Sequence, residues 1–306
     1  MLSRTAANLY WTGRYIERAE NNARMLQVSL EAALQREEES EWPSAIELFG
    51  NRSLFSSRYG EPTREALTAF AILDAENPSS VRSCLQSARE NLRALRAAIA
   101  SELWETVNAD WLRLREFAER DVTLGARELC EWVVSRAHLF RGIAENTTLR
   151  DDAYHFLQLG SFIERADNTA RLLAAKYPAL KDADSAPASA YYAWGAVLRA
   201  LSAFRAYHQV YRDVIATARV TELLVLRRDM PRSLRYCAQQ TMEHLAHLGK
   251  NRDLESERMA GELYATLRFA RMDRVLEAGL VQFLAEVVAR LAAMGDQITK
   301  DFLMPV

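Results

Sequence analysis

The sequence predicts an all-α protein, and three observations lead to that prediction. Apolar residues recur at spacings of three and four residues over most of the 306-residue chain, whereas clean alternation with a period of two is hard to find. Alanine, leucine, arginine and glutamate dominate the composition, and these residues favour helices. Only 11 glycines and 7 prolines interrupt the pattern. We therefore expect a helical bundle with a sizeable core.

The expected helices follow one another with short connections. The first covers residues 3–37 and ends in the charged run REEESE, which is typical of a solvated terminus. The sequence Asn-Pro-Ser-Ser at 77–80 is a good helix start, and PALKDADSAPASA at 178–190 is the clearest linker because it is rich in Pro, Ala, Ser and Asp. The other expected helices lie within 41–62, where a loop follows the helix, and at 63–75, 76–108, 109–119, 124–147, 150–177, 191–216, 218–228, 231–249, 254–269 and 273–302.

Parts of the sequence occur twice. Residues 13–19 read GRYIERA and residues 160–166 read GSFIERA, while residues 78–84 (PSSVRSC) match residues 231–237 (PRSLRYC). Two copies cannot form an open solenoid, so they are expected to share a core. We therefore predict a helical bundle built from two duplicated halves, residues 1–149 and 150–306, which pack as one globular unit with pseudo-two-fold symmetry.

Each copy of the repeated helix has an apolar stripe and a polar face. The stripe consists of Leu9, Ile16, Ala19, Ala23 and Leu26 in the first copy, and of Phe156, Ile163, Ala166, Ala170 and Leu173 in the second. Spacings of four and seven residues place three polar side chains together on the other face. These side chains are Glu17, Asn21 and Arg24 in the first copy, and Glu164, Asn168 and Arg171 in the second.

The charged residues of these helices allow two interpretations. Glu20 with Arg24, and Asp167 with Arg171, have the spacing of favourable ion pairs within a helix. Adjacent Glu and Arg side chains point about 100° apart, so we expect the arginines of both Glu-Arg pairs, Arg18 and Arg165, to reach a neighbouring helix or the other half. The residues then form either structural ion pairs between helices or a polar cleft that binds an anion, a peptide or a phosphate.

Charge, cysteines and motifs narrow the functional classes. The formal net charge of −2 argues against a nucleic-acid binder and against electrostatic membrane binding, and no apolar run is long enough for a membrane span. Cys84, Cys130 and Cys237 have no CxxC spacing and suit reduced thiols of a cytoplasmic protein. His244 and His247 are three residues apart, but the paired Glu-x-x-His motifs of a di-metal bundle are missing. We expect no metal and no cofactor.

Three segments resemble the bacterial alpha-E family, a predicted all-helical domain named for its Glu-Arg motif. They are LGSFIERADNTARLL at 159–173, TLRDDAYHFL at 148–157 and the stretch at 76–108, and the resemblance covers essentially the whole chain. The family is implicated in operons with circularly permuted ATP-grasp ligases and transglutaminase-like peptidases. The resemblance therefore implies a role in forming or processing amide or peptide bonds.

The leading hypothesis is a non-catalytic accessory protein of such a ligase and peptidase, with a peptide as a possible substrate. The residues expected to bind the partner or the substrate are Glu17, Arg18, Asn21, Arg24, Glu164, Arg165, Asn168 and Arg171. One alternative is an enzyme of the same system, in which Glu17 or Glu164 is the general base and the arginines bind a carboxylate or phosphate. Another is a purely structural helical protein.

Overall fold

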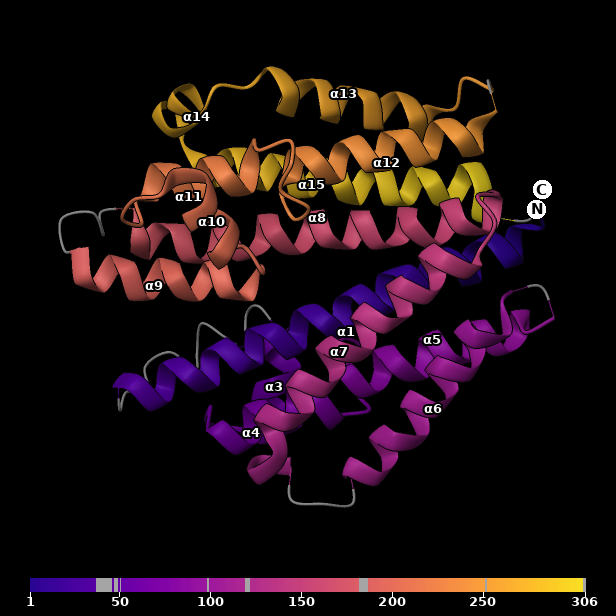
Figure 1. Cartoon of the computed structure of the whole chain (residues 1–306), viewed down its shortest axis with the longest axis horizontal. Coiled ribbons are helices and arrows are strands. Elements are labelled where there is room, and N and C mark those ends of the chain that lie inside the picture. Colours follow the sequence, from indigo (N-terminus) through magenta and orange to yellow (C-terminus); the bar gives the residue numbers. More distant parts are fainter. Residues whose placement is uncertain are drawn as a thin grey trace. The chain divides into compact units, whose positions relative to one another are not determined.

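The fold is known from a computed structural model, which describes residues 1–36, 46, 49, 51–97, 99–118, 122–181, 187–250 and 252–304. Every regular element in these ranges is a helix, and they contain no β-strand (Figure 1). The all-α prediction is therefore confirmed. None of the described helices combines the length and the apolar character needed to cross a membrane.

The chain forms two compact units. One contains residues 8–160, and the other contains residues 161–306 together with residues 1–7. Two helices, α1 (Ser3–Arg36) and α8 (Asp152–Leu180), each begin in one unit and continue into the other. The predicted division at residues 149 and 150 and the pseudo-two-fold relation stay predictions.

The 8–160 unit is built around most of α1 and the helices that follow it. In this unit α5 contacts α6, which in turn contacts α7. Its core contains fully buried aromatic and aliphatic residues such as Phe55, Phe70 and Leu92. After α1 the elements are α3 (Arg52–Tyr59), α4 (Arg64–Thr68), the π-helix Ala69–Leu73, α5 (Val81–Leu95), α6 (Ser101–Ala118) and α7 (Val122–Thr147).

The 161–306 unit contains most of α8 and the helices of the second part of the chain. In this unit α13 contacts both α12 and α15, and Figure 1 shows it running alongside α12. The largest fully buried side chain is that of Trp194, whose indole N–H donates to the Thr217 hydroxyl at 3.0 Å. The elements after α8 are α9 (Pro187–Ala200), α10 (Phe204–Tyr211), α11 (Thr217–Val225), α12 (Leu234–Gly249), α13 (Glu255–Phe269), α14 (Met272–Ala278), α15 (Leu280–Ile298) and the π-helix Thr299–Leu303.

Three predicted helices are interrupted in the structure. The helix expected at 76–108 ends at Leu95, and α6 then covers residues that the sequence divided between two helices. The helix expected at 191–216 is broken at 201–203. The helix expected at 273–302 is broken at Gly279, whose φ of 111° is a conformation that favours glycine. The structure also places 178–180 in α8 and 187–190 in α9, so the predicted linker is shorter, and its residues 182–186 lie outside the described part. In the segment 41–62, where a helix followed by a loop was expected, residues 41–45, 47, 48 and 50 lie outside the described part, and α3 covers Arg52–Tyr59.

Gly160 marks a close approach between α8 and α1 in the 8–160 unit. A Cβ atom built on Gly160 would lie 2.0 Å from the carbonyl oxygen of Tyr10 and 3.2 Å from the amide nitrogen of Arg14. Both neighbours are backbone atoms of α1, so no side chain can move aside. Glycine is therefore required here because the two helix backbones meet without room for a side chain.

Candidate functional site

The repeated helices bury their apolar stripes completely and parts of their polar faces. All ten residues predicted for the two apolar stripes are buried, as expected. On the polar face of the first copy, Glu17 is fully buried and Asn21 is 2% exposed. The first Glu-Arg helix therefore does not present these two side chains to solvent, although their polarity alone would favour exposure.

A cluster of ion pairs surrounds the buried glutamates of α1. Arg141 of α7 donates one guanidinium nitrogen to Glu17 Oε2 at 3.1 Å and another to Glu20 Oε2. Arg24 donates its Nε to Glu20 Oε1 at 2.7 Å, which confirms the predicted pair at a spacing of four residues. Both carboxylates have no exposed surface, whereas the side chains of Arg141 and Arg24 are 24% and 15% exposed. We call Glu17, Glu20, Arg24 and Arg141 the α1–α7 charge cluster.

The buried carboxylates of the α1–α7 charge cluster are compensated by neighbouring cations. Glu17 and Glu20 face the guanidinium groups of Arg141 and Arg24. Removing carboxylates from water is costly unless cations and hydrogen bonds replace the lost hydration. His138, one turn before Arg141, adds a ring nitrogen 3.5 Å from Glu20 Oε1 and 3.1 Å from an Arg24 nitrogen. The cluster therefore fixes α7 against α1.

The second Glu-Arg helix has a different environment in the 161–306 unit. Glu164 and Arg165 are 6% and 9% exposed. The Arg165 guanidinium lies 5.1 Å from the centre of the Phe162 ring, and the His244 ring stacks on Phe162 at 5.6 Å. In the second copy a cation–π contact with Phe162 therefore stabilises the charge of the motif arginine, and the His244 ring packs on the same Phe162.

The outer part of the second polar face is partly accessible. Asn168 is half-buried and Arg171 is exposed. Arg171 donates its Nε to Asp167 at 2.7 Å, which confirms the second predicted pair. Arg18 of the first copy is half-buried. Of the eight predicted residues, Arg171 is therefore exposed, Arg18, Arg24 and Asn168 are half-buried, and the other four are buried.

Arg141 of the α1–α7 charge cluster and the neighbouring His138 were not predicted from the sequence. Arg141 and His138 lie on α7, more than a hundred positions after the glutamates that they contact. Their spacing of three residues shows that they share a helix face. Nothing in the sequence indicates which distant helix that face meets.

The segment before α5 resembles the segment before α12 in its contacts. Asn22 of the first motif helix donates its side-chain nitrogen to the carbonyl of Ser79, and Thr169 of the second donates its hydroxyl to the carbonyl of Arg232 at 3.0 Å. In each unit a serine then caps the next helix, and a buried cysteine follows one turn later. These residues are Ser80 and Cys84 in one unit, and Ser233 and Cys237 in the other.

The cysteines and the histidine pair are placed as packing residues. All three cysteines are buried and free of disulfides, and burial raises the pKa of the Cys130 thiol to about 12. His244 is buried against Phe162, while His247 is exposed, so the two imidazoles differ in environment. Within the described residues, no three His, Cys, Asp or Glu side chains lie close enough together to hold a metal ion.

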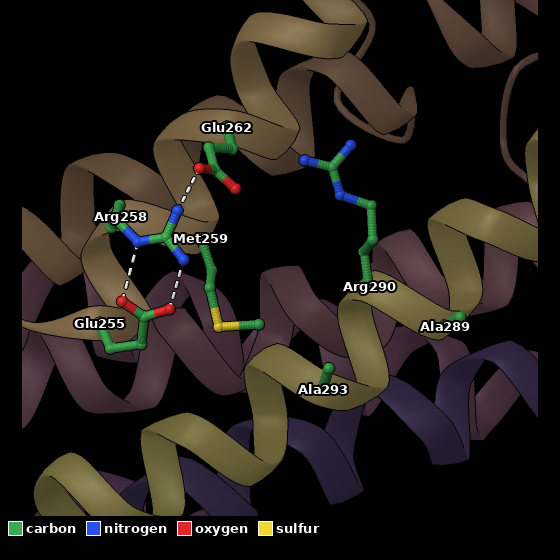
Figure 2. Close-up of a pocket in the computed structure, with 7 residues that line it drawn as sticks. All are labelled: Glu255, Arg258, Met259, Glu262, Ala289, Arg290 and Ala293. Carbon is green, nitrogen blue, oxygen red and sulfur yellow. Dashed lines mark hydrogen bonds and ion pairs between the residues drawn. The ribbon is translucent and has the colours of Figure 1, made fainter.

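A surface pocket of about 350 Å³ lies between α13 and α15. In Figure 2 the Arg258 side chain lies between Glu255 and Glu262 and is joined to both, while Arg290 stands on the other wall. Met259, Ala289 and Ala293 line the rest. Arg258 is already neutralised by two carboxylates, and Arg290 donates to the Thr266 hydroxyl at 3.0 Å. Because both arginines already have partners and exposed ion pairs are weak, these side chains can contribute little binding free energy to a ligand in this pocket.

The fold and the buried clusters define an all-helical protein organised around two Glu-Arg helices. Residues 1–303 match the family model of Alpha-E, which is described as a predicted alpha-helical domain with a conserved ER motif. The chain therefore belongs to the Alpha-E family, and the resemblance seen in its sequence is confirmed.

Two relatives come from mycobacteria. They are "Uncharacterized protein Mb2597" of Mycobacterium bovis and "Uncharacterized protein Rv2567" of Mycobacterium tuberculosis strain H37Rv, each 26% identical over 328 residues. The matched region includes 97% of this chain and 36% of each relative. The chain thus spans about a third of the length of these relatives. No solved structure matches it.

Proposed function

We propose that this protein is a non-catalytic accessory protein of a circularly permuted ATP-grasp ligase, in a system that also contains a transglutaminase-like peptidase and forms or processes amide or peptide bonds. The observation that carries the proposal is the use of the Glu-Arg motif inside the first unit. Glu17 and Glu20 accept hydrogen bonds from Arg141 and Arg24, and neither carboxylate is exposed. The motif then organises a scaffold that presents other residues to the partner.

Two further observations support an accessory role. In both relatives, about two thirds of the polypeptide lies outside the region that matches this chain. A helical domain that occurs within longer chains is suited to act beside another domain. The three buried cysteines form no disulfide, which suits a reducing compartment, so we propose that the protein acts in the cytoplasm with its ligase.

The proposal includes an internal duplication. The paired contacts of Asn22 with Ser79 and of Thr169 with Arg232, followed in each unit by a serine cap and a buried cysteine, support it. Duplication also accounts for two Glu-Arg helices whose environments have diverged. We propose that the second copy, with Asn168 and Arg171 accessible, provides the contact with the ligase or its peptide substrate, and that the first copy serves the scaffold.

The test combines the purified chain with the purified ATP-grasp ligase encoded in the same genome. We expect a complex by size-exclusion chromatography, a Kd of about 1 µM by calorimetry, and a change in the ligase's turnover when the chain is added. Arg171→Met should weaken binding about tenfold, which is the effect of losing about 1.4 kcal/mol. Arg274→Met is the matched control, because Arg274 is also exposed and also pairs with one carboxylate, that of Glu277.

Three results would contradict the proposal. The first is that no complex forms at about 100 µM protein and the ligase's turnover is unaffected. The second is that the Arg171 and Arg274 variants lose equal affinity, which would remove the second copy from the interface. The third is that the purified chain alone converts a peptide or amino-acid substrate, which would make it an enzyme.

A further inference from the structure

The helices α9 and α10 carry a surface whose charge differs from that of the whole chain. Residues 187–212 include three arginines and no aspartate or glutamate, whereas the formal net charge of the chain is −2. The two helices contact each other in the 161–306 unit (Figure 1). The α9–α10 surface, as we call it, consists of Tyr191, Tyr192, Arg199, Phe204, Arg205, His208 and Arg212.

Aromatic rings connect the two helices on this surface. Tyr191 and Tyr192 are 41% and 56% exposed, which is unusual for large aromatic side chains that have a core available. The Tyr191 ring meets the edge of Phe204 at 6.4 Å, and Phe204 contacts the His208 ring at 4.8 Å. Exposed tyrosines are common at protein interfaces because they supply a large, rigid contact area.

Arg199 packs against one of these aromatic rings, that of Phe204. Its guanidinium carbon lies 5.4 Å from the centre of the Phe204 ring. Its Nε atom is buried and has no hydrogen-bond acceptor within the described part of the chain. A buried N–H group without an acceptor is unfavourable, so the described part of the chain does not fully satisfy this guanidinium group. Arg199 as a whole is half-buried.

Two more arginines extend the positive charge along α10. Arg205 lies on α10 at a spacing of three residues from His208, which places the two on one helix face, and Arg212 follows directly after the helix in a left-handed conformation. Arg205 and Arg212 are both exposed. No ion pair joins Arg199, Arg205 or Arg212 to a carboxylate of the described residues. The next carboxylates along the chain are engaged elsewhere: Asp213 accepts from Arg219 at 2.5 Å, and Glu222 accepts from the Tyr211 hydroxyl at 3.1 Å.

We propose that the α9–α10 surface binds an acidic peptide segment of a partner protein, with carboxylates on Arg199, Arg205 and Arg212 and apolar contacts on the two tyrosines. Charge complementarity argues for this partner, since residues 187–212 supply three guanidinium groups and no carboxylate of their own. A nucleic acid fits less well, because its charge density calls for a more extensive basic surface than three arginines on a chain of negative net charge.

The test measures peptide binding by the purified full chain alone, with no ligase present. The probe is a fluorescein-labelled peptide of alternating glutamate and glycine, and its binding is followed by fluorescence anisotropy. The comparison probes are a peptide of alternating lysine and glycine and an oligo-dT strand. We expect the acidic peptide to bind with a Kd well below about 1 mM, and to bind more weakly as salt is added.

Paired variants separate the surface from net charge. The double variant Arg205→Gln/Arg212→Gln should weaken binding about tenfold. Arg268→Gln/Arg290→Gln removes the same charge from the same unit, also at arginines outside any described ion pair, and should leave the affinity within about twofold. Tyr192→Ser, at an exposed position, should weaken binding without changing the circular dichroism spectrum.

Four outcomes would overturn the inference. They are no binding of the acidic peptide at about 1 mM, equal losses in the two double variants, equal affinity for the lysine peptide, and tighter binding of oligo-dT. The last outcome would identify the surface as a nucleic-acid site. This surface is distinct from the proposed ligase contact on α8, and a failed peptide assay leaves the ligase assay to be judged on its own result.

Discussion

The close crossing of α8 and α1 at Gly160 can be tested by replacing glycine with alanine. The substitution should destabilise the fold at Gly160 and stabilise it at Gly142. In Gly160→Ala the new Cβ would lie 2.0 Å from the carbonyl oxygen of Tyr10, where ordinary contact begins at 3.4 Å. The two helices must therefore separate locally by about 1.4 Å, because both the methyl group and its neighbour are fixed to backbones. The separation weakens the contacts of the residues packed around the crossing.

The magnitude follows from two opposing effects. Forcing an extra methyl group into a packed interior costs about 3 kcal/mol when nothing can move aside, and alanine regains about 1 kcal/mol because it favours helix more than glycine does. We expect Gly160→Ala to lower the free energy of unfolding by about 2 kcal/mol or more, measured by urea unfolding with circular dichroism.

Gly142→Ala in α7 is the control. No atom lies within 4 Å of the Cβ position of Gly142, so alanine there should raise the unfolding free energy by about 0.5–1 kcal/mol through helix propensity alone. If Gly160→Ala is as stable as the wild type while Gly142→Ala behaves as expected, the close crossing is wrong.

Three further predictions concern buried ionisable groups. Arg141→Met leaves two buried glutamates without that cation and should lower the unfolding free energy by about 3–5 kcal/mol. Arg171→Met, which removes an exposed ion pair, should lower it by less than about 1 kcal/mol. Similar losses in the two variants would refute the buried cluster. Burial raises the pKa of Asp110 from 3.8 to about 6 despite its pair with Arg136. Because the pKa of Asp110 is higher in the folded than in the unfolded state, its protonation stabilises the fold fully below about pH 4, and this contribution is lost as the pH rises through about 6. In urea titrations across that range, the unfolding free energy of the wild type should fall by up to about 3 kcal/mol relative to that of Asp110→Asn. A difference that does not change with pH would refute the shift. Burial and the raised pKa of Cys130 predict that its thiol does not react with Ellman's reagent at neutral pH until denaturant is added, and rapid labelling of the folded chain would contradict its placement.

Local signals in the sequence were sufficient for most helices but not for every interruption. Asn-Pro-Ser-Ser predicted the start of α5, and Ser80 does cap it by accepting from the Ser83 amide at 3.0 Å. No glycine or proline marks the break after Leu95, and residues 96–100 consist of residues that favour helix. The helices on either side of the break, α5 and α6, contact each other. Such packing is a tertiary effect that helix propensity does not record. The break at Gly279 did carry a signal, a glycine within an apolar helical pattern.

The candidate site was predictable only within single helices. The pairs of Glu20 with Arg24 and of Asp167 with Arg171 follow from spacing and are present. Burial of Glu17 does not follow from spacing, since a glutamate is normally expected on a solvated face. It requires Arg141, which a helix wheel of α1 cannot reveal.

Both boundaries between the two compact units fall within helices. The polypeptide passes from one unit to the other at residues 7 and 8 within α1, and at residues 160 and 161 within α8. A protease needs an extended, unprotected backbone, so neither passage offers a convenient cutting point, and limited proteolysis is a poor route to the separate units. A fragment that starts at residue 161 would lack residues 1–7, which belong to the same unit. A gene that joins residues 1–7 to residues 161–306 is therefore the better design for producing this unit alone.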